Sequence, residues 1–248
     1  MSAAQGCCPG SEEAPEFSVI IPVWHEAEGI NGLVAHVRAA ACGERLEIVV
    51  CDGAPQADTL AALRDGEVVR VRAAQGRAAQ MNAGAHAASG RILLFLHADT
   101  RLPHGAFAAV RQGLQQLEAT GKGGAGAFRL GIEGASGFLY AVQVAANLRN
   151  RWTRTPYGDQ VQFFRAAYFR LLGGYSALPL MEDVDMMRRI RNRGDAIALL
   201  PLSVSTSARR WRAEGAVYCS LRNVCLRLLY ALGVPARTLS RWYLASKR

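Results

Sequence analysis

Cysteine patterns typical of secreted or zinc-binding proteins are missing from this sequence, although its 248 residues include six cysteines. No pair has the C-x-x-C spacing of a zinc site, and the intervals are irregular, at Cys7, Cys8, Cys42, Cys51, Cys219 and Cys225. A disulfide framework or a zinc site would need a more regular arrangement. We therefore expect reduced thiols, as in a cytoplasmic protein.

Segments that would direct the chain to or through a membrane are also missing. Residues 1–16 contain no basic region followed by an apolar stretch, so they are expected to form a disordered leader rather than a signal peptide. The longest uncharged stretch, residues 134–148, is too short and too polar to span a bilayer. An integral membrane protein is not expected, whereas contact with a membrane surface is left open.

Acidic residues are too few to balance the basic ones: the sequence has 20 Asp and Glu but 29 Lys and Arg, which gives a net charge of +9. This excess favours anionic partners such as nucleic acid, anionic lipid or phosphorylated small molecules, although it also simply promotes solubility. No helix-turn-helix, zinc-finger or RNP1 pattern occurs, so no specific nucleic-acid partner is expected.

Short apolar segments alternate with helical ones through the first half of the chain. Strands are predicted at 17–23, 46–51, 68–72 and 92–96, and helices at 28–41, 55–64, 76–89 and 103–117. This alternation predicts an α/β fold with a doubly wound, mostly parallel sheet. After residue 121 we expect a strand within 121–134, a helix at 135–151, a loop at 157–160, a strand at 161–164, a helix at 181–193, a strand at 196–200, and from 211 two helices broken at 233–235.

The sequence Arg91 to Pro103, RILLFLHADTRLP, is the most informative segment. Its apolar residues predict a buried strand that leads directly into His97-Ala98-Asp99. Ligands bind beyond the carboxyl ends of the strands in open α/β sheets. A carboxylate there suits a hard divalent cation and, with it, a diphosphate, although Asp99 could instead cap the helix that follows. The pattern indicates a nucleotide-linked substrate.

Several motifs follow one another in a characteristic order: IIPVWHE, an Asp after the second strand, GRAAQMNAG, HADT, GDQ, MEDVD and RRW. In this order they resemble the family 2 glycosyltransferases, which have a GT-A fold, and are most similar to a small bacterial branch associated with radical-SAM and selenium-related genes. The resemblance spans about residues 17–212, leaving 1–16 as the leader and 213–248 as C-terminal amphipathic helices. It implies inverting, metal-dependent sugar transfer from a nucleotide-diphosphate donor of UDP or GDP type to an acceptor hydroxyl or lipid phosphate.

Five residues match the donor-binding part of the family. Pro22 and Glu26 belong to the region that lines the nucleobase and ribose, although an acid such as Glu26 is also common at a helix start. Asp52 is interpreted as a base or ribose contact, or else as a turn-forming residue before glycine. Arg77, at a glycine-preceded helix N-terminus, is expected near the diphosphate unless it is an ordinary exposed arginine. Asn82 is expected to hold ribose or base.

The metal motif of the family is usually Asp-x-Asp. Here Asp99 matches its second, metal-binding position, and His97 replaces the first. The implied cofactor is Mn²⁺ or Mg²⁺. A ligating imidazole would favour Mn²⁺, but His97 could instead only contact the nucleotide.

The predicted catalytic residues are the paired acids Glu182 and Asp183. The resemblance assigns Asp183 as the base that takes the acceptor proton, with Glu182 in support. Asp185 could belong to the same cluster, and the alternative is an acidic helix start balanced by later arginines. Asp159 is a candidate for sugar or acceptor contact, or simply part of a polar loop.

Arg210 and Trp211 resemble the end of the Gln-x-x-Arg-Trp motif of processive members. The leading Gln is missing, because Ser207 occupies its place, which argues against processive synthesis. Arg210 is expected to neutralise diphosphate. Trp211 either stacks on an acceptor ring or packs in the core.

Residues 217–230 predict one amphipathic helix, whose apolar face comprises Val217, Tyr218, Leu221, Val224, Cys225, Leu228 and Leu229. We expect this face to pack on the catalytic domain. The alternative is a basic amphipathic helix at a membrane surface, and a lipid acceptor would be compatible with both. The predicted location is cytoplasmic, with the inner face of the membrane as an option.

Two other functions are considered. Nucleotidyltransferases of related fold carry a glycine-rich, basic loop after the first strand, and residues 23–26 do not have one. A catalytically silent nucleotide-sugar-binding protein is the other alternative, because His97 replaces the first metal-motif Asp.

Overall fold

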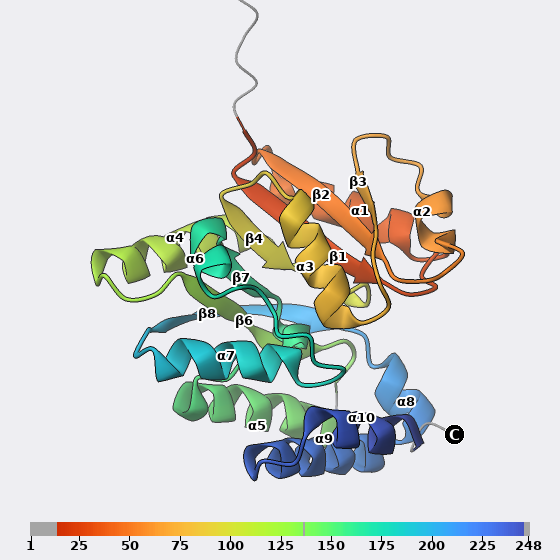
Figure 1. Cartoon of the computed structure of the whole chain (residues 1–248), viewed down its shortest axis with the longest axis vertical. Helices are drawn as coiled ribbons and strands as arrows, with labels where there is room; N and C mark the ends of the chain where they lie inside the picture. Colours follow the sequence, from red (N-terminus) through yellow and green to blue (C-terminus); the bar gives the residue numbers. More distant parts are fainter. Residues whose placement is uncertain (1–13, 136, 246–248) are drawn as a thin grey trace, which may run out of the picture.

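The computed structural model describes residues 14–135 and 137–245, and within them one mixed sheet of eight strands forms the centre of the molecule (Figure 1). The strands are β1 (Phe17–Val23), β2 (Leu46–Asp52), β3 (Val69–Arg72), β4 (Ile92–Phe95), β5 (Thr100–Arg101), β6 (Ala125–Ile132), β7 (Gln162–Arg165) and β8 (Ile197–Thr206). They lie in the order β3-β2-β1-β4-β7-β6-β8-β5. The first four are parallel, and β7 is antiparallel to both β4 and β6. The predicted mostly parallel α/β sheet is confirmed.

Helices cover both faces of this sheet. They are α1 (Ile30–Ala41), α2 (Asp58–Ala62), α3 (Arg77–Ala87), α4 (Ala106–Ala119), α5 (Phe138–Thr153), α6 (Ala166–Leu171), α7 (Glu182–Asn192), α8 (Arg209–Glu214), α9 (Ala216–Ala231) and α10 (Ala236–Ala245), with a 3-10 turn η1 (Gly158–Gln160). One core cluster joins β1 and β2 to α1, α2 and α4, and a second joins the other sheet face to α3, α6 and α7. This three-layer packing explains why β1 and β4 read as continuous apolar runs.

One glycine allows the close approach of three strands. A Cβ at Gly126 in β6 would lie 2.3 Å from the Phe163 ring and 2.5 Å from the Ala198 carbonyl oxygen. We expect Gly126→Ala to lower the free energy of unfolding by about 1–3 kcal/mol, because the two neighbouring strands cannot separate without losing their own packing. Urea unfolding measures this change.

Gly32→Ala is the matched control for that substitution. Gly32 lies in α1, and a Cβ there would meet nothing within 4 Å. Replacing a helical glycine by alanine in open space should raise the unfolding free energy by about 0.5–1 kcal/mol. Equal stability of the two variants would contradict the crowding at Gly126.

Several predicted boundaries are wrong. The helix expected at 55–64 is reduced to α2, because Ala57 takes a left-handed conformation immediately before it. β8 extends six residues past the predicted end at residue 200, through Pro201. Its register against β6 shifts between Ala127 and Arg129, so Pro201 lies in the irregular stretch, where a missing N–H is tolerated. The short elements α6 and β5 were not predicted.

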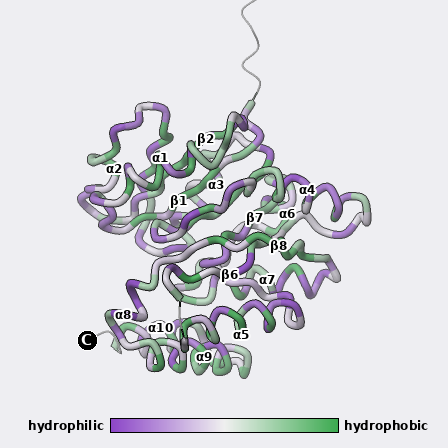
Figure 2. Tube along the Cα trace, turned by 180° about the vertical axis from the view of Figure 1, so that it is seen from behind, coloured by the Kyte–Doolittle hydropathy of each residue, from purple (hydrophilic) through white to green (hydrophobic). Residues whose placement is uncertain are grey.

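The C-terminal region corrects a larger expectation. The break at 233–235 is confirmed, but α8 is an additional helix before α9. The apolar face of α9 does not pack on the catalytic domain: among its predicted members only Leu229 is half-buried, and the rest are exposed. α9 instead buries Cys219 and Leu226 on its opposite side, where Leu226 meets Leu239 of α10 and Met181. Figure 2 shows hydrophobic residues along α9 at the lower margin of the molecule.

Most of the leader predicted at residues 1–16 lies outside the described residues, which begin at residue 14, and so do Cys7 and Cys8. Glu16, the last residue of the predicted leader, accepts hydrogen bonds of 2.8 Å from Arg111. The described cysteines, Cys42, Cys51, Cys219 and Cys225, are free thiols. Within the described part of the chain, every helix is too short or too polar to cross a bilayer.

Candidate functional site

The predicted metal and catalytic residues converge beyond the end of β4. Gly158 in η1 lies between them, because a Cβ there would be 3.0 Å from the His97 ring and 3.4 Å from Asp183 Oδ2. The Gly158 N–H donates a 2.7 Å hydrogen bond to that same Asp183 oxygen. Residues from the turn after β4, from η1 and from α7, far apart in the sequence, therefore meet at one point.

Asp99 lies in the turn between β4 and β5. Its backbone carbonyl accepts a 2.9 Å hydrogen bond from Ser207 N, which joins this turn to the start of α8. Its Oδ1 accepts a 3.3 Å hydrogen bond from the Thr100 hydroxyl. The Asp99 charge acts on both Arg77 and Asp159, so this carboxylate belongs to the cluster.

Glu182, the first residue of α7, is almost fully buried, at 3 % exposure. Its Oε1 has no hydrogen-bond partner among the described residues, and the guanidinium of Arg77 lies 3.6 Å away. Burial and the neighbouring Asp183 charge raise the pKa of Glu182, against the attraction of Arg77. Asp183 itself is held by two backbone N–H groups, those of Gly158 and Val184, each at 2.7 Å.

Asp159 presents a second carboxylate oxygen in need of a partner. Its Oδ1 is buried and accepts no hydrogen bond from any described residue. Burial, with the charges of Asp183 and Asp99, raises its pKa to about 6, although Arg149 opposes the shift. A buried oxygen of this kind is satisfied by a cation or by a hydroxyl donor, so the site is built to receive a polar group.

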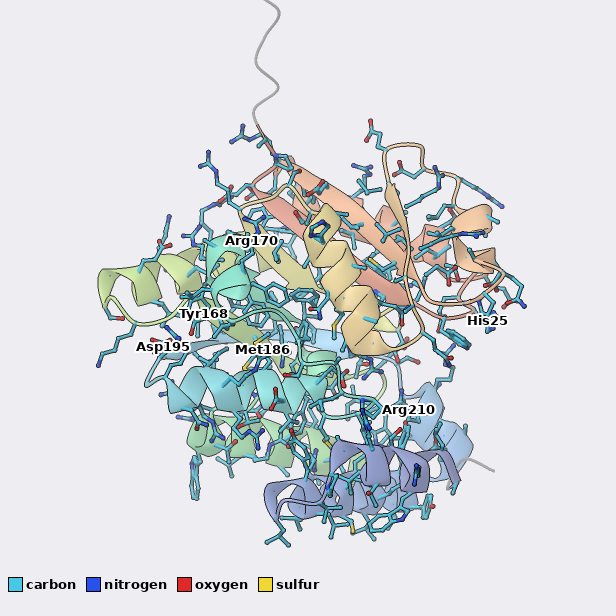
Figure 3. All side chains as sticks on the ribbon, viewed as in Figure 1. His25, Tyr168, Arg170, Met186, Asp195 and Arg210 are labelled. Atoms are coloured by element: carbon cyan, nitrogen blue, oxygen red, sulfur yellow. The ribbon has the colours of Figure 1, made fainter. Side chains whose placement is uncertain are left out.

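Arginines surround these acids. The guanidinium of Arg149 lies 3.8 Å from the centre of the Tyr157 ring, and that of Arg227 in α9 lies 4.7 Å from it. Burial lowers the pKa of Arg149 to about 10. Figure 3 shows Arg210 extending from α8 towards the space between α3 and α10. Burial, with the charges of Arg77 and Arg210, lowers the pKa of His97 well below its usual value, so its imidazole is neutral and keeps a lone pair.

Two residues expected to contact the nucleotide are engaged by the protein itself. Asp52 is 1 % exposed and accepts hydrogen bonds from the backbone N–H groups of Ala54, Thr59 and Leu60. Asp52 therefore stabilises the turn after β2, in agreement with its alternative interpretation as a turn-forming residue. Asn82 donates to the Tyr175 carbonyl at 2.8 Å and accepts from the Tyr175 N–H at 2.9 Å, so its amide clamps the loop before α7.

The remaining predicted residues lie in β1, in the loop after it and in α8. Pro22 is half-buried at the end of β1, and Glu26 accepts a 3.2 Å hydrogen bond from Arg209 of α8. Trp211 packs against the small cluster that contains Leu130 and Ala208, which matches its core-packing interpretation.

Asp185 does not join the acids of the site. It binds Ser176 at 2.6 Å, Arg188 at 2.7 Å and Arg189 at 3.1 Å, so its charge is neutralised inside α7 and its neighbouring loop.

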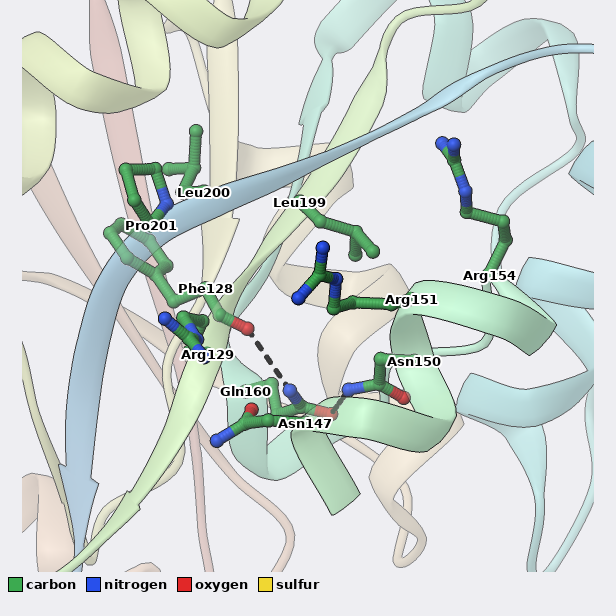
Figure 4. A pocket seen from close by; sticks show the side chains of 10 residues that line it. All are labelled: Phe128, Arg129, Asn147, Asn150, Arg151, Arg154, Gln160, Leu199, Leu200 and Pro201. Carbon is green, nitrogen blue, oxygen red and sulfur yellow. Dashed lines mark hydrogen bonds between the residues drawn. The ribbon is translucent and has the colours of Figure 1, made fainter. Parts of the chain in front are cut away.

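Sequence reasoning missed the groups that position η1. Gln160 donates to the Phe128 carbonyl at 3.0 Å and accepts from Asn150 at 2.7 Å, and both residues line a cavity of about 490 Å³ behind the turn (Figure 4). The stacking of Arg149 and Arg227 on Tyr157 was also missed. No local pattern signals these contacts, since their partners come from β6, α5, η1 with the residue before it, and α9.

The site offers oxygen ligands for a metal ion, but the protein side chains alone do not complete its coordination. No group of three or more His, Cys, Asp or Glu side chains within the described residues is arranged to hold an ion. Asp99 and the unpartnered oxygen of Asp159 suit a hard cation such as Mg²⁺ or Mn²⁺, which often takes one or two carboxylates and completes its shell with substrate phosphates. The residues present therefore fit an ion that is bound together with a diphosphate.

Comparisons with solved structures show the same fold. S. aureus TarS 1-349 is 15% identical, with a TM-score of 0.57, and the match covers 86% of this chain and 65% of that one. Its form in complex with UDP-GlcNAc gives 14% identity and 0.59 over 93% of this chain and 72% of the other. The mannosyltransferase PcManGT from Pyrobaculum calidifontis, with GDP-Man and Mn²⁺, gives 20% and 0.56, and the match covers 79% of this chain and 57% of that one. The chain thus spans less than two thirds of TarS 1-349 in the first of these structures and of PcManGT in the third.

No curated protein matches the sequence significantly. The model of "Glycosyl transferase family 2" matches residues 18–172, which is more than half of the chain and includes β1 to α6. The chain therefore belongs to glycosyl transferase family 2, and its fold is that of the GT-A glycosyltransferase structures.

Proposed function

We propose that this enzyme transfers a sugar from a nucleotide-diphosphate donor of UDP or GDP type to an acceptor hydroxyl or lipid phosphate, with inversion at the anomeric carbon. The observation that carries the proposal is the convergence of Asp99, Asp159 and Asp183 with Arg77 at the sheet edge, where one oxygen of Asp159 and one of Glu182 accept no hydrogen bond from a described residue. The structural neighbours solved with GDP-Man and UDP-GlcNAc support this donor class.

Asp99 would hold the Mn²⁺ or Mg²⁺ ion, and the neutral imidazole of His97 would contribute to the ion or to the nucleotide. A bound ion supplies Lewis-acid stabilisation of the departing diphosphate. Arg77 and Arg210 add positive charge near His97, and both charges contribute to lowering the pKa of its imidazole. We assign both arginines to the diphosphate.

Asp183 is assigned as the base that takes the proton from an acceptor hydroxyl. Its two hydrogen bonds from Gly158 and Val184 fix the carboxylate orientation, and each oxygen keeps a lone pair for the acceptor. Glu182 positions Arg77 through their 3.6 Å contact. The unpartnered oxygen of Asp159, which also suits the ion, would accept a hydrogen bond from a hydroxyl of the sugar or acceptor.

The nearest alternative is a nucleotide-sugar-binding protein without catalysis, since His97 replaces an acid. We favour the enzyme because the assigned base is already oriented. The similarity to the bacterial branch associated with radical-SAM and selenium-related genes stays a prediction. So does the cytoplasmic location, with the inner face of the membrane as an option.

Thermal and urea unfolding with UDP, GDP, dTDP or CDP, each with and without Mn²⁺ or Mg²⁺, tests the donor site. A nucleotide at a hundred times its dissociation constant should stabilise the protein by about 2.7 kcal/mol. We expect stabilisation by one nucleotide that requires metal and is lost in Asp99→Asn.

Asp65→Asn is the control, because Asp65 pairs with Arg38 at 2.9 Å outside the cluster, and it should retain the nucleotide effect. A lack of response to every nucleotide would contradict the donor site. Stabilisation without any sugar transfer or donor hydrolysis would favour the silent binding protein.

A further inference from the structure

One side of α9 carries exposed apolar side chains in a continuous row. We call this row the outer stripe and define it as Val217, Tyr218, Leu221, Val224, Cys225 and Leu228. Leu221 is 63% exposed and Leu228 is 61% exposed. The members of the outer stripe recur at intervals of three and four residues along the chain, which places them on one face of the helix. A contiguous apolar face of this kind is typical of a surface that binds another apolar surface.

The outer stripe is not required to attach α9 to the fold. The opposite side of the helix does this, since Cys219 and Leu226 are 0% and 5% exposed. Leu226 belongs to a cluster with Met181 and Leu239, and Tyr230 reaches Asp185 of α7 at 3.5 Å. α9 therefore has two apolar sides, and folding covers only one of them.

The charge around the stripe selects an anionic partner. Within residues 209–245 the sequence has seven arginines and one acid, Glu214. That acid is hydrogen-bonded to Arg222 and offsets this arginine, and Glu26 pairs with Arg209. The other arginines leave the segment with a net positive charge. A second copy of this chain would place one arginine-rich surface against another, whereas an anionic surface would be attracted.

Aromatic side chains favour a lipid bilayer as that anionic surface. Trp242 of α10 is 51% exposed, and Trp152 at the end of α5, the helix that contacts α9, is 82% exposed. Tryptophan and tyrosine prefer the boundary between headgroups and acyl chains, and arginines at a helix surface bind anionic headgroups. Figure 1 shows α5, α9 and α10 together at the lower margin of the molecule.

We propose that α9 lies on the surface of an anionic phospholipid bilayer, with the outer stripe inserted at the boundary between headgroups and acyl chains. The same helix reaches the candidate site, because Arg227 stacks on Tyr157 beside Gly158 and Asp159. A bilayer that binds α9 is thus next to the assigned base. The inference that the acceptor is carried by a lipid rests on the proposed function, but the docking itself does not.

Vesicle flotation tests the docking with two vesicle types, phosphatidylcholine alone and an equal mixture of phosphatidylcholine and phosphatidylglycerol. We expect binding of the full chain to the mixed vesicles, weakened by salt. The double substitution Leu221→Glu and Leu228→Glu should weaken partitioning by about a hundredfold, because two side chains no longer enter the bilayer boundary. Both side chains are exposed, so the fold should be unaffected.

Leu171→Glu is the matched control, since Leu171 in α6 is 65% exposed and lies outside α9. It should bind vesicles as the unsubstituted chain does.

Two further variants separate membrane docking from catalysis. Asp99→Asn should keep vesicle binding, whereas the α9 double variant should keep donor hydrolysis in vesicle-free solution.

Equal vesicle binding by the double variant and the unsubstituted chain would overturn the proposal. So would a stable dimer in solution that the double substitution converts to a monomer, because the stripe would then bind a second copy.

Discussion

Asp183→Asn is expected to lower kcat by about a hundredfold to ten-thousandfold, because a positioned general base contributes that much to proton transfer. Asn keeps the shape of the side chain and an oxygen that can accept the Gly158 N–H. It cannot accept a proton from an acceptor hydroxyl at neutral pH. Steady-state transfer to acceptor, measured with saturating donor, checks the change.

Nucleotide binding separates this effect from a misfolded site. Asp183→Asn should still be stabilised by the cognate nucleotide and metal, whereas Asp99→Asn should not. Asp65→Asn should retain both turnover and stabilisation, since Asp65 pairs with Arg38 outside the cluster. Unchanged turnover in Asp183→Asn would show that another group takes the proton.

Burial raises the pKa of the Asp159 carboxyl to about 6. At a pH above this value, Asp159→Asn should stabilise the ligand-free enzyme by up to about 3 kcal/mol, because Asn cannot ionise. Its folded pKa is raised from 3.8, so the folded protein binds the proton more tightly than the unfolded chain does. The unsubstituted protein therefore loses stability as the pH rises through this interval. The gain from Asn should disappear below pH 3.8. Urea unfolding across pH, with EDTA present, measures it.

Asp185→Asn is the matched control with the opposite sign. Burial opposes ionisation of Asp185, but hydrogen bonds from Ser176 and Arg188 outweigh it and lower the pKa. Its charge is stabilising above the unfolded value of 3.8, so Asn should destabilise the protein there, and the loss should fade as the pH falls through the lowered folded pKa. The same pH trend in both variants would contradict the different environments assigned to these two acids.

The sequence predicted that Asp99, Glu182 and Asp183 belong to one site, because strand-end position and motif order point to the same edge of the sheet. Their roles stay predictions. It could not decide the role of Asp52 or Asn82. Whether such a side chain faces a ligand or the backbone depends on the path of the next loop. The left-handed turn at Ala57 brings the Thr59 N–H onto Asp52, and no short-range pattern encodes that encounter.

Helical periodicity had a similar limit in α9. It correctly grouped the apolar residues on one face, because the 3.6-residue repeat determines which side chains point the same way. It does not show which face the rest of the protein covers. Here Cys219 and Leu226, on the other side, make the buried contact, and the longer apolar row stays exposed.

The strand order of the sheet has a consequence during synthesis on the ribosome. The parallel strands β3, β2, β1 and β4 are complete once residue 95 has emerged, but the free edge of β4 is covered only by residues 162–165 of β7. Until then the nascent chain displays an unpaired edge with the sequence ILLF, which other chains or chaperones can bind. A translational pause between these points should therefore increase aggregation more than a pause after residue 165.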